Sequence, residues 1–195
     1  MTWNFSPHIL LQGIDQLGAQ NYLQSFEGNK KCVVAGVADK YTNSQYDDIP
    51  IFDLVKEAIA HQENISTSLI FSHPYQVLDA GLEAIKGGIQ QLIIHTEKIP
   101  PFDLLKLYEK ARSQGVKILG ASQGGILIPE KFYAGVVNAH IFSLGNIAIL
   151  NYGDGAIASE LAYHWKKSNL GVSAVINLGN NPLSLIDWEL WLKVL

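Results

Sequence analysis

Residues 8–22 read HILLQGIDQLGAQNY, and this stretch decides the fold. Residues 9–11 form an apolar run of strand length, Gly13 follows the run, and a helical pattern then continues to Phe26. A strand that turns through glycine into a helix brings backbone amides and the helix N-terminus to one edge of a sheet. The stretch therefore predicts the first strand and helix of an α/β sheet, joined by a glycine turn at the edge of the sheet.

The same alternation continues to residue 130. Apolar, β-rich runs alternate with longer helix-like stretches, and the later runs are KCVVAGV at 31–37, TSLIFS at 67–72, QQLIIHT at 90–96 and VKILGAS at 116–122. Alternation of this kind specifies a parallel sheet that is covered by helices. We therefore expect an α/β fold in which residues 1–130 form a Rossmann-like domain.

A second unit follows this domain. Residues 131–144 are interpreted as a connector, after which residues 146–179 repeat the pattern of strand, glycine turn, helix and strand. Two strands are too few for a well-covered parallel sheet, so residues 145–195 are predicted to form an incomplete second domain. The segment 183–195 is apolar around most of its circumference, and either the first domain or a partner, including a second copy of the chain, must cover it.

Composition argues against several classes of function. Lys and Arg number 14 against 18 Asp and Glu, a formal charge of −4 without runs of like charge, which does not fit nucleic-acid binding. The apolar runs are too short for a membrane span of roughly 20 residues. Cys32 is the only cysteine, the first residues do not resemble a secretory signal, and no metal-binding motif occurs. We therefore expect a cytoplasmic protein without a disulfide or a metal site.

Four segments carry a family resemblance: QGIDQLGAQNY at 12–22, VAGVADKYTNSQYDDIPIFDLVKEA at 34–58, LEAIKGGIQQLIIHTEKIP at 82–100 and GVKILGASQGGILIP at 115–129. In this order and spacing they resemble the alpha subunit of succinyl-CoA synthetase and related CoA-binding domains. The resemblance implies a CoA-binding Rossmann domain followed by a flavodoxin-like domain that is truncated in this chain. It also implies CoA or acyl-CoA as the cofactor and a separate beta subunit as the protein partner.

The resemblance assigns candidate cofactor-binding residues to the turns after the strands: Gly13, Ile14, Asp15, Gly18, Lys40, Ser72, His73, Thr96 and Glu97. In the first turn, Gln16 stands where the family has glycine and Leu17 stands where it has lysine. Asp15 adds a negative charge beside the expected phosphates, which should weaken CoA binding. Asp15 is alternatively the N-cap of the first helix, and Glu97 either caps the helix near Pro101 or forms the floor of the ligand cleft.

The later turns depart further from the family. Residues 153–155, Gly-Asp-Gly, replace a Ser-Arg-Ser-Gly turn that holds phosphate, and the family's phosphorylated histidine would lie beyond the last aligned segment. We therefore predict no catalytic residue, no ligase activity from this chain alone, and a role as a non-catalytic interaction or assembly module. The alternatives are a sensor subunit for CoA, acyl-CoA or a nucleotide, and a ligase subunit that a partner chain completes.

Overall fold

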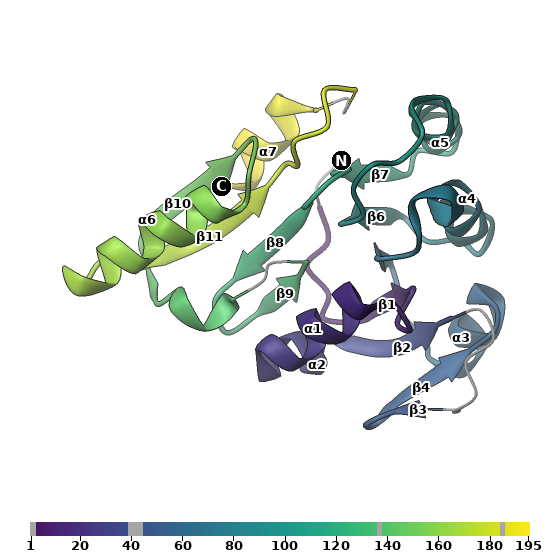
Figure 1. Cartoon of the computed structure of the whole chain (residues 1–195), viewed down its shortest axis with the longest axis horizontal. Coiled ribbons are helices and arrows are strands. Elements are labelled where there is room, and N and C mark those ends of the chain that lie inside the picture. Colours follow the sequence, from purple (N-terminus) through teal and green to yellow (C-terminus); the bar gives the residue numbers. More distant parts are fainter. Residues whose placement is uncertain (1–2, 39–44, 136–137, 184–185) are drawn as a thin grey trace.

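The computed structural model describes residues 3–38, 45–135, 138–183 and 186–195. Its larger sheet has seven strands in the order β3-β4-β2-β1-β5-β6-β7 (Figure 1). All neighbours pair in parallel except β3 and β4, which are antiparallel. The strands are β1 (Ile9–Gln12), β2 (Val33–Val37), β3 (Gln45–Tyr46), β4 (Ile49–Phe52), β5 (Thr67–Ile70), β6 (Gln91–Ile94) and β7 (Lys117–Leu119).

Three helices cover one face of this sheet. They are α3 (Val55–His61), α4 (Val77–Lys86), which the 3-10 turn η1 (Pro74–Gln76) precedes, and α5 (Pro101–Ser113). Their apolar residues pack with Leu10, Ile70 and Leu92 of the strands in one buried cluster. Ile9 and Leu11 face the opposite side, because successive residues of a strand point to opposite faces. Central strands buried on both faces explain the continuous apolar runs of the sequence.

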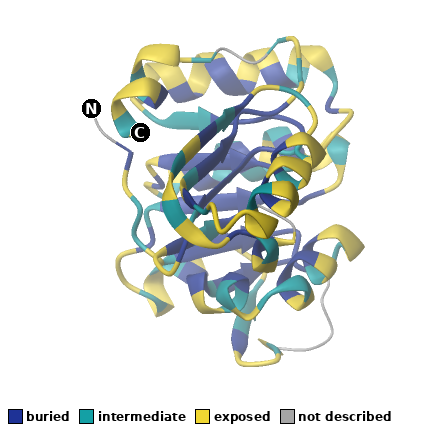
Figure 2. Ribbon diagram, turned by 90° about the vertical axis from the view of Figure 1, so that its left-hand side faces the viewer, coloured by how far each residue is buried: buried dark blue, intermediate teal, exposed yellow. Residues whose placement is uncertain are grey.

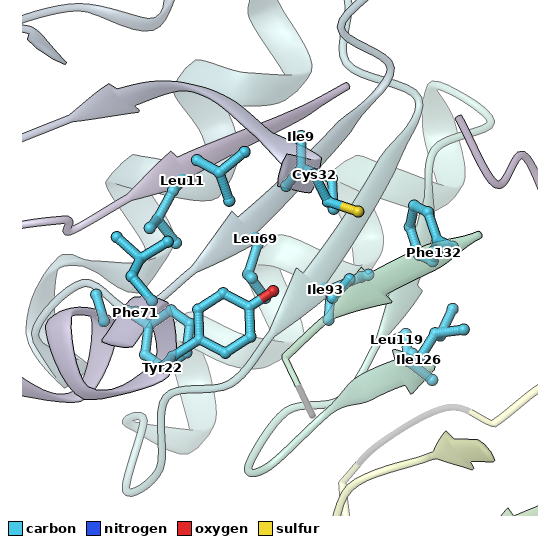
Figure 3. Packing of buried hydrophobic residues seen from close by; sticks show 14 of the residues in the cluster. Ile9, Leu11, Tyr22, Cys32, Leu69, Phe71, Ile93, Leu119, Ile126 and Phe132 are labelled. Carbon is cyan, nitrogen blue, oxygen red and sulfur yellow. The ribbon is translucent and has the colours of Figure 1, made fainter. Parts of the chain in front are cut away.

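The opposite face is covered by α1 (Leu17–Ser25), by α2 (Glu27–Cys32) and by a second sheet. Figure 3 shows the shared core, in which Tyr22 of α1 and Phe132 of the second sheet lie with strand residues such as Leu69. The Tyr22 hydroxyl donates a hydrogen bond to the Tyr133 carbonyl at 3.0 Å. Because one apolar cluster joins both sheets, the second sheet is part of the same packed body as the first.

The second sheet has four described strands, in the order β10-β11-β8-β9. Two of these strands, β10 and β11, come from the predicted second unit, and the antiparallel hairpin of β8 and β9, from earlier in the chain, pairs with β11 and completes the sheet. β8 lies within the predicted first domain and β9 within the predicted connector, yet both belong to the second sheet. The remaining elements are β8 (Gly125–Ile128), β9 (Phe132–Ala134), η2 (Ala139–Ile141), β10 (Leu144–Asn151), α6 (Ala156–Lys167), β11 (Val172–Asn177) and α7 (Trp188–Val194).

The terminal segment is covered partly by the chain itself. Trp191 of α7 is 2% exposed, belongs to the core that the two sheets share, and packs against Trp3. The other side of α7 is open, with Trp188 and Leu192 exposed. Figure 2 shows burial concentrated in the strands and exposed residues on the outer sides of the helices. None of the helices in the described ranges is long and apolar enough to cross a membrane.

Candidate functional site

Two cavities open along the edge where the parallel strands end. The larger has a volume of about 680 Å³ and lies among the turns that follow β1, β5, β6 and β7, a turn of the second sheet, and the start of α6. The smaller has a volume of about 440 Å³ and lies among the ends of β1, β2 and β4 and the start of α4. Gln16 and Ser72 line both cavities. The carboxyl edge of a parallel sheet is the usual ligand site of such folds.

The turn after β1 is held close to the end of β5. Gly13 has a φ of +80°, its N–H donates to the Val37 carbonyl at 2.8 Å, and a Cβ at this position would lie 2.6 Å from the Ser72 nitrogen. Only glycine combines this backbone conformation with so close an approach. Ile14 is fully buried against Gly36, so its side chain belongs to the core rather than to the ligand surface.

The start of α1 opens into the larger cavity. Leu17 and Gly18, the first two residues of the helix, line the cavity. The N-cap residue is Gln16, so the interpretation of Asp15 as the N-cap is wrong. The Gln16 amide donates to the Asp15 carboxylate at 3.1 Å, and within the described residues the Gln16 side chain makes no cap hydrogen bond. The amides of this first turn are therefore available to an anion.

The ends of β5 and β6 supply the next candidate residues. Ser72 is 8% exposed, and its carbonyl accepts a hydrogen bond from the Thr96 hydroxyl at 2.8 Å, which joins the two turns. His73 is exposed at the mouth of the larger cavity, and its ring stacks on Tyr75 with centroids 5.6 Å apart. The strand ends therefore bring Ser72, His73 and Thr96 together at one edge, as the sequence predicted.

Hydrogen bonds of the Gln123 side chain connect Glu97 to the start of α6. The Gln123 amide nitrogen donates to the Glu97 carboxylate at 2.7 Å, and its oxygen accepts from the Gly155 N–H at 3.0 Å. The Asp154 carboxylate accepts from the Ala156 N–H at 2.8 Å. The first amides of α6 are thus already bonded to side-chain oxygens. Glu97 does not cap α5, whose first-turn amides bond to the Pro100 carbonyl, so that interpretation is wrong.

His95 forms part of the wall between the larger cavity and the core. Its ring packs on Phe71 with centroids 4.5 Å apart, and Nδ1 lies 3.4 Å from the Gly124 carbonyl oxygen. Burial lowers the pKa of His95 below its ordinary value, and the hydrogen bond to Gly124 and the charge of Glu97 offset only part of this effect. The imidazole is therefore neutral at neutral pH.

The two cavities differ in charge. Asp15, Asp53, Asp79 and Glu83 line the smaller cavity, and the Glu83 carboxylate accepts from the Val55 N–H at 2.8 Å. Lys98 lines the larger cavity. Lys40, the lysine predicted to contact a phosphate, lies outside the described residues. Among the described residues that line these cavities, positive charge is therefore found only on the side of the larger one.

Sequence reasoning identified the altered turn at residues 153–155, but it missed Gln123 and His95 as parts of this site. Gln123 stands in the glycine-rich turn after β7, and His95 is the last residue before Thr96, so both positions follow strands whose ends were known to meet. That shared position was a usable signal for both residues. Which side chains bridge to α6 depends on the placement of the second sheet, which no local pattern reveals.

The fold and the site define an α/β protein of the Rossmann-like kind, with a ligand cleft at the carboxyl edge of its sheet. Residues 6–98 match the CoA binding domain family, in agreement with the resemblance found in the sequence. The chain is also similar over most of its length to alpha subunits of succinate–CoA ligases, as the resemblance implied.

Two of these alpha subunits have the same sequence identity to this chain. The ADP-forming succinate–CoA ligase subunit alpha 2 of Archaeoglobus fulgidus is 30% identical over 180 residues, covering 92% of this chain and 62% of the relative. The corresponding alpha subunit of Aquifex aeolicus is 30% identical over 182 residues, covering 92% and 59%. The chain thus spans about three fifths of the length of these relatives.

A solved structure shows the same fold. The crystal structure of PH0766 from Pyrococcus horikoshii OT3 superposes with a TM-score of 0.77, and the match covers 97% of this chain and 44% of that chain. The two sequences are 20% identical, so the likeness concerns the fold alone.

Proposed function

We propose that this chain binds CoA or an acyl-CoA along the carboxyl edge of its larger sheet, and works with a protein partner without transferring phosphoryl groups itself. A contrast between two helix starts carries the proposal. In α1, the side chain of the N-cap residue Gln16 makes no cap hydrogen bond, so the first-turn amides are open to the larger cavity. In α6, the side chains of Gln123 and Asp154 already accept hydrogen bonds from the first amides. The first helix start accepts a diphosphate, and the second does not.

The two cavities suit the shape of CoA, which joins an adenosine part to a pantetheine arm through a diphosphate. Because Gln16 and Ser72 border both cavities, a ligand too long for one of them extends past these residues into the other. In this proposal the amides of Leu17 and Gly18 hold the diphosphate, and Lys98 adds positive charge. Bound CoA would supply the thiol that carries an acyl group.

The carboxylates of the smaller cavity favour CoA that lacks the phosphate on its ribose. Carboxylate oxygens accept hydrogen bonds from ribose hydroxyl and adenine amino groups, but they repel a phosphate on the ribose. If the adenosine part lies there, CoA without its ribose phosphate binds at least as tightly as CoA itself.

The absence of phosphoryl transfer follows from the chemistry of the α6 start. Phosphoryl transfer depends on amides and cations that stabilise the negative charge of the transferred group. The Gly155 and Ala156 amides donate to Gln123 and Asp154, and the Asp154 carboxylate repels an incoming phosphate.

The partner in this proposal is a second subunit, as the names of the similar ligase subunits suggest.

Isothermal titration of the chain with CoA, acetyl-CoA and dephospho-CoA tests the binding. Gly18→Asp places a carboxylate at the helix start, where it suits the helix dipole, and a Cβ there meets only Phe71 at an ordinary 3.5 Å. This variant should keep its stability and bind CoA about tenfold or more weakly, because the added charge faces the diphosphate. Gly18→Ala is the matched control for added volume without charge.

Two outcomes would overturn the proposal. If none of the three ligands binds, or if Gly18→Asp and Gly18→Ala bind equally well, the α1 start is not the diphosphate site. The non-catalytic part is tested separately by intact-mass measurement after incubation with ATP or GTP, magnesium, succinate and CoA. A phosphorylated form of the chain would contradict it.

A further inference from the structure

Asn177, the last residue of β11, carries a buried amide nitrogen that makes no hydrogen bond. Asn177 is 5% exposed and lines the larger cavity. Its Oδ1 accepts from Nδ2 of Asn151 at 3.3 Å, whereas its own Nδ2 donates to none of the residues that the structure describes. A buried donor without an acceptor costs free energy. A ligand atom that lies against this nitrogen must therefore accept a hydrogen bond.

Neighbouring groups fix which end of the Asn177 amide is the free one. Nδ2 of Asn151 donates to the Asp154 carbonyl at 3.0 Å, and a carbonyl oxygen can only accept. The Asn177 atom that faces this same nitrogen is therefore the oxygen, and the Asn177 nitrogen stays free. Strand β11 lies between β10 and β8, so paired strands hold Asn177 in place on both sides.

Gly155, at the start of α6, keeps the space beside this nitrogen open. Its φ of −62° suits any residue, so the backbone conformation does not require glycine. A Cβ at this position would lie 3.3 Å from Nδ2 of Asn177 and 3.4 Å from Oε1 of Gln123. Ser159 lines the same cavity one helical turn later, and helical side chains tilt towards the N-terminus. The Ser159 hydroxyl is therefore a second donor on this side of the cavity.

The charges near these donors favour an uncharged acceptor. The Glu97 carboxylate is bonded to Gln123, and the Asp154 carboxylate is bonded to the Ala156 amide. Both carboxylates repel an anionic group, and the Gly155 amide already donates to Gln123. A carbonyl oxygen has no charge and accepts two hydrogen bonds, so it suits the donors of Asn177 and Ser159.

We infer that Asn177 and Ser159 bind the thioester carbonyl oxygen of an acyl-CoA with an uncharged acyl group, so that the chain prefers acyl-CoA to free CoA. This inference rests on the proposed function. With the diphosphate at the start of α1 and the adenosine part in the smaller cavity, the pantetheine arm extends through the larger cavity towards the second sheet. Free CoA ends in a thiol, which is a weak acceptor and leaves the Asn177 nitrogen unpaired.

Isothermal titration with CoA, acetyl-CoA and S-ethyl-CoA tests the inference. S-ethyl-CoA is a thioether of the same chain length as acetyl-CoA, without the carbonyl oxygen. The natural chain should bind acetyl-CoA about fivefold more tightly than S-ethyl-CoA, because only acetyl-CoA offers the acceptor. Asn177→Asp keeps the oxygen that Asn151 needs and removes the donor, so the two ligands should then bind equally.

Two further variants complete the test. Asn177→Ala removes the whole amide and should also abolish the preference, while CoA itself binds within about twofold of the natural affinity. Asn64→Asp makes the same change as Asn177→Asp at an exposed loop position with a φ of +68°, which Asp tolerates, and is the matched control. It should keep the preference for acetyl-CoA. Melting temperatures show that each variant is folded.

The outcomes separate this inference from the proposed function. If none of the three ligands binds, both fail. If all three bind the natural chain equally well, CoA binding stands and the role of Asn177 is overturned. The role is also overturned if the preference survives in both Asn177 variants. Equal weakening of CoA and acetyl-CoA by these variants would overturn it too, because Asn177 would then contact the pantetheine arm rather than the acyl group.

Discussion

The indole rings of Trp3 and Trp191 lie with their centroids 4.8 Å apart, so the two ends of the chain meet in one core. Both residues are buried, and the cluster they join also contains Ile9 of the central strand β1. The terminal helix is therefore part of the fold on this side, and only its outer side remains open.

Trp191→Ala should lower the free energy of unfolding by about 3–5 kcal/mol, because it removes a buried indole and leaves a cavity. Leu192→Ala, at a neighbouring position that is 65% exposed, should change it by less than about 0.5 kcal/mol. Urea unfolding of both variants measures the difference. Equal effects would mean that α7 does not dock on the core.

Gly13 should be far less tolerant of substitution than Gly88. Both have a positive φ, but a Cβ at Gly13 would meet the Ser72 backbone at 2.6 Å, whereas a Cβ at Gly88 meets nothing within 4 Å. Gly88→Ala should cost about 1 kcal/mol of backbone strain. Gly13→Ala should cost about 2 kcal/mol more, because the turn must move away from β5. Equal midpoints of thermal unfolding would show that the close approach is absent in solution.

Removal of the Gln123 side chain should free the Gly155 amide. Gln123→Ala should lower the free energy of unfolding by about 1 kcal/mol through the lost hydrogen bonds. It should also let millimolar phosphate stabilise the protein at the α6 start, seen as a higher melting temperature. Gln90→Ala removes an exposed glutamine elsewhere and is the control. If phosphate changed the melting temperature equally in the natural chain and in both variants, the Gln123 side chain would not be what occupies the Gly155 amide.

His95 should make stability depend on pH. Its pKa lies below the ordinary 6.5 in the folded state, so below that pH the unfolded chain binds more protons than the folded one. The stability that depends on the neutral His95 imidazole is fully present above pH 6.5. The free energy of unfolding then decreases as the pH falls towards the folded pKa, by at most about 1.4 kcal/mol per pH unit.

Urea unfolding between pH 5 and 8 measures this slope. His95→Gln should flatten it, whereas His73→Gln, at an exposed position, should leave it unchanged. A slope that persists in His95→Gln would assign the pH dependence to another group.

Local patterns were sufficient for the larger sheet and for its ligand edge. The runs around β1, β5 and β6 are apolar without interruption because these strands are buried on both faces, and this property is visible in the residues themselves. The positions of Gly13, Ser72 and Thr96 at one edge followed from the rule that parallel strands end together. The roles of Asp15 and Glu97 as helix caps were wrong, because Gln16 occupies the N-cap position of α1 and the Pro100 carbonyl accepts from the first-turn amides of α5.

The sequence by itself determined the parallel sheet, the resemblance of residues 6–98 to the CoA binding domain family and the glycine turn after β1, since each depends on residues that are near one another in the chain. Only the tertiary structure decided that β8 and β9 complete the second sheet and that Gln123 joins Glu97 to α6. Strand partners and bridging side chains depend on which apolar faces meet in space. The shared core places residues that are distant in sequence against one another, and neither periodicity nor motif spacing records that placement.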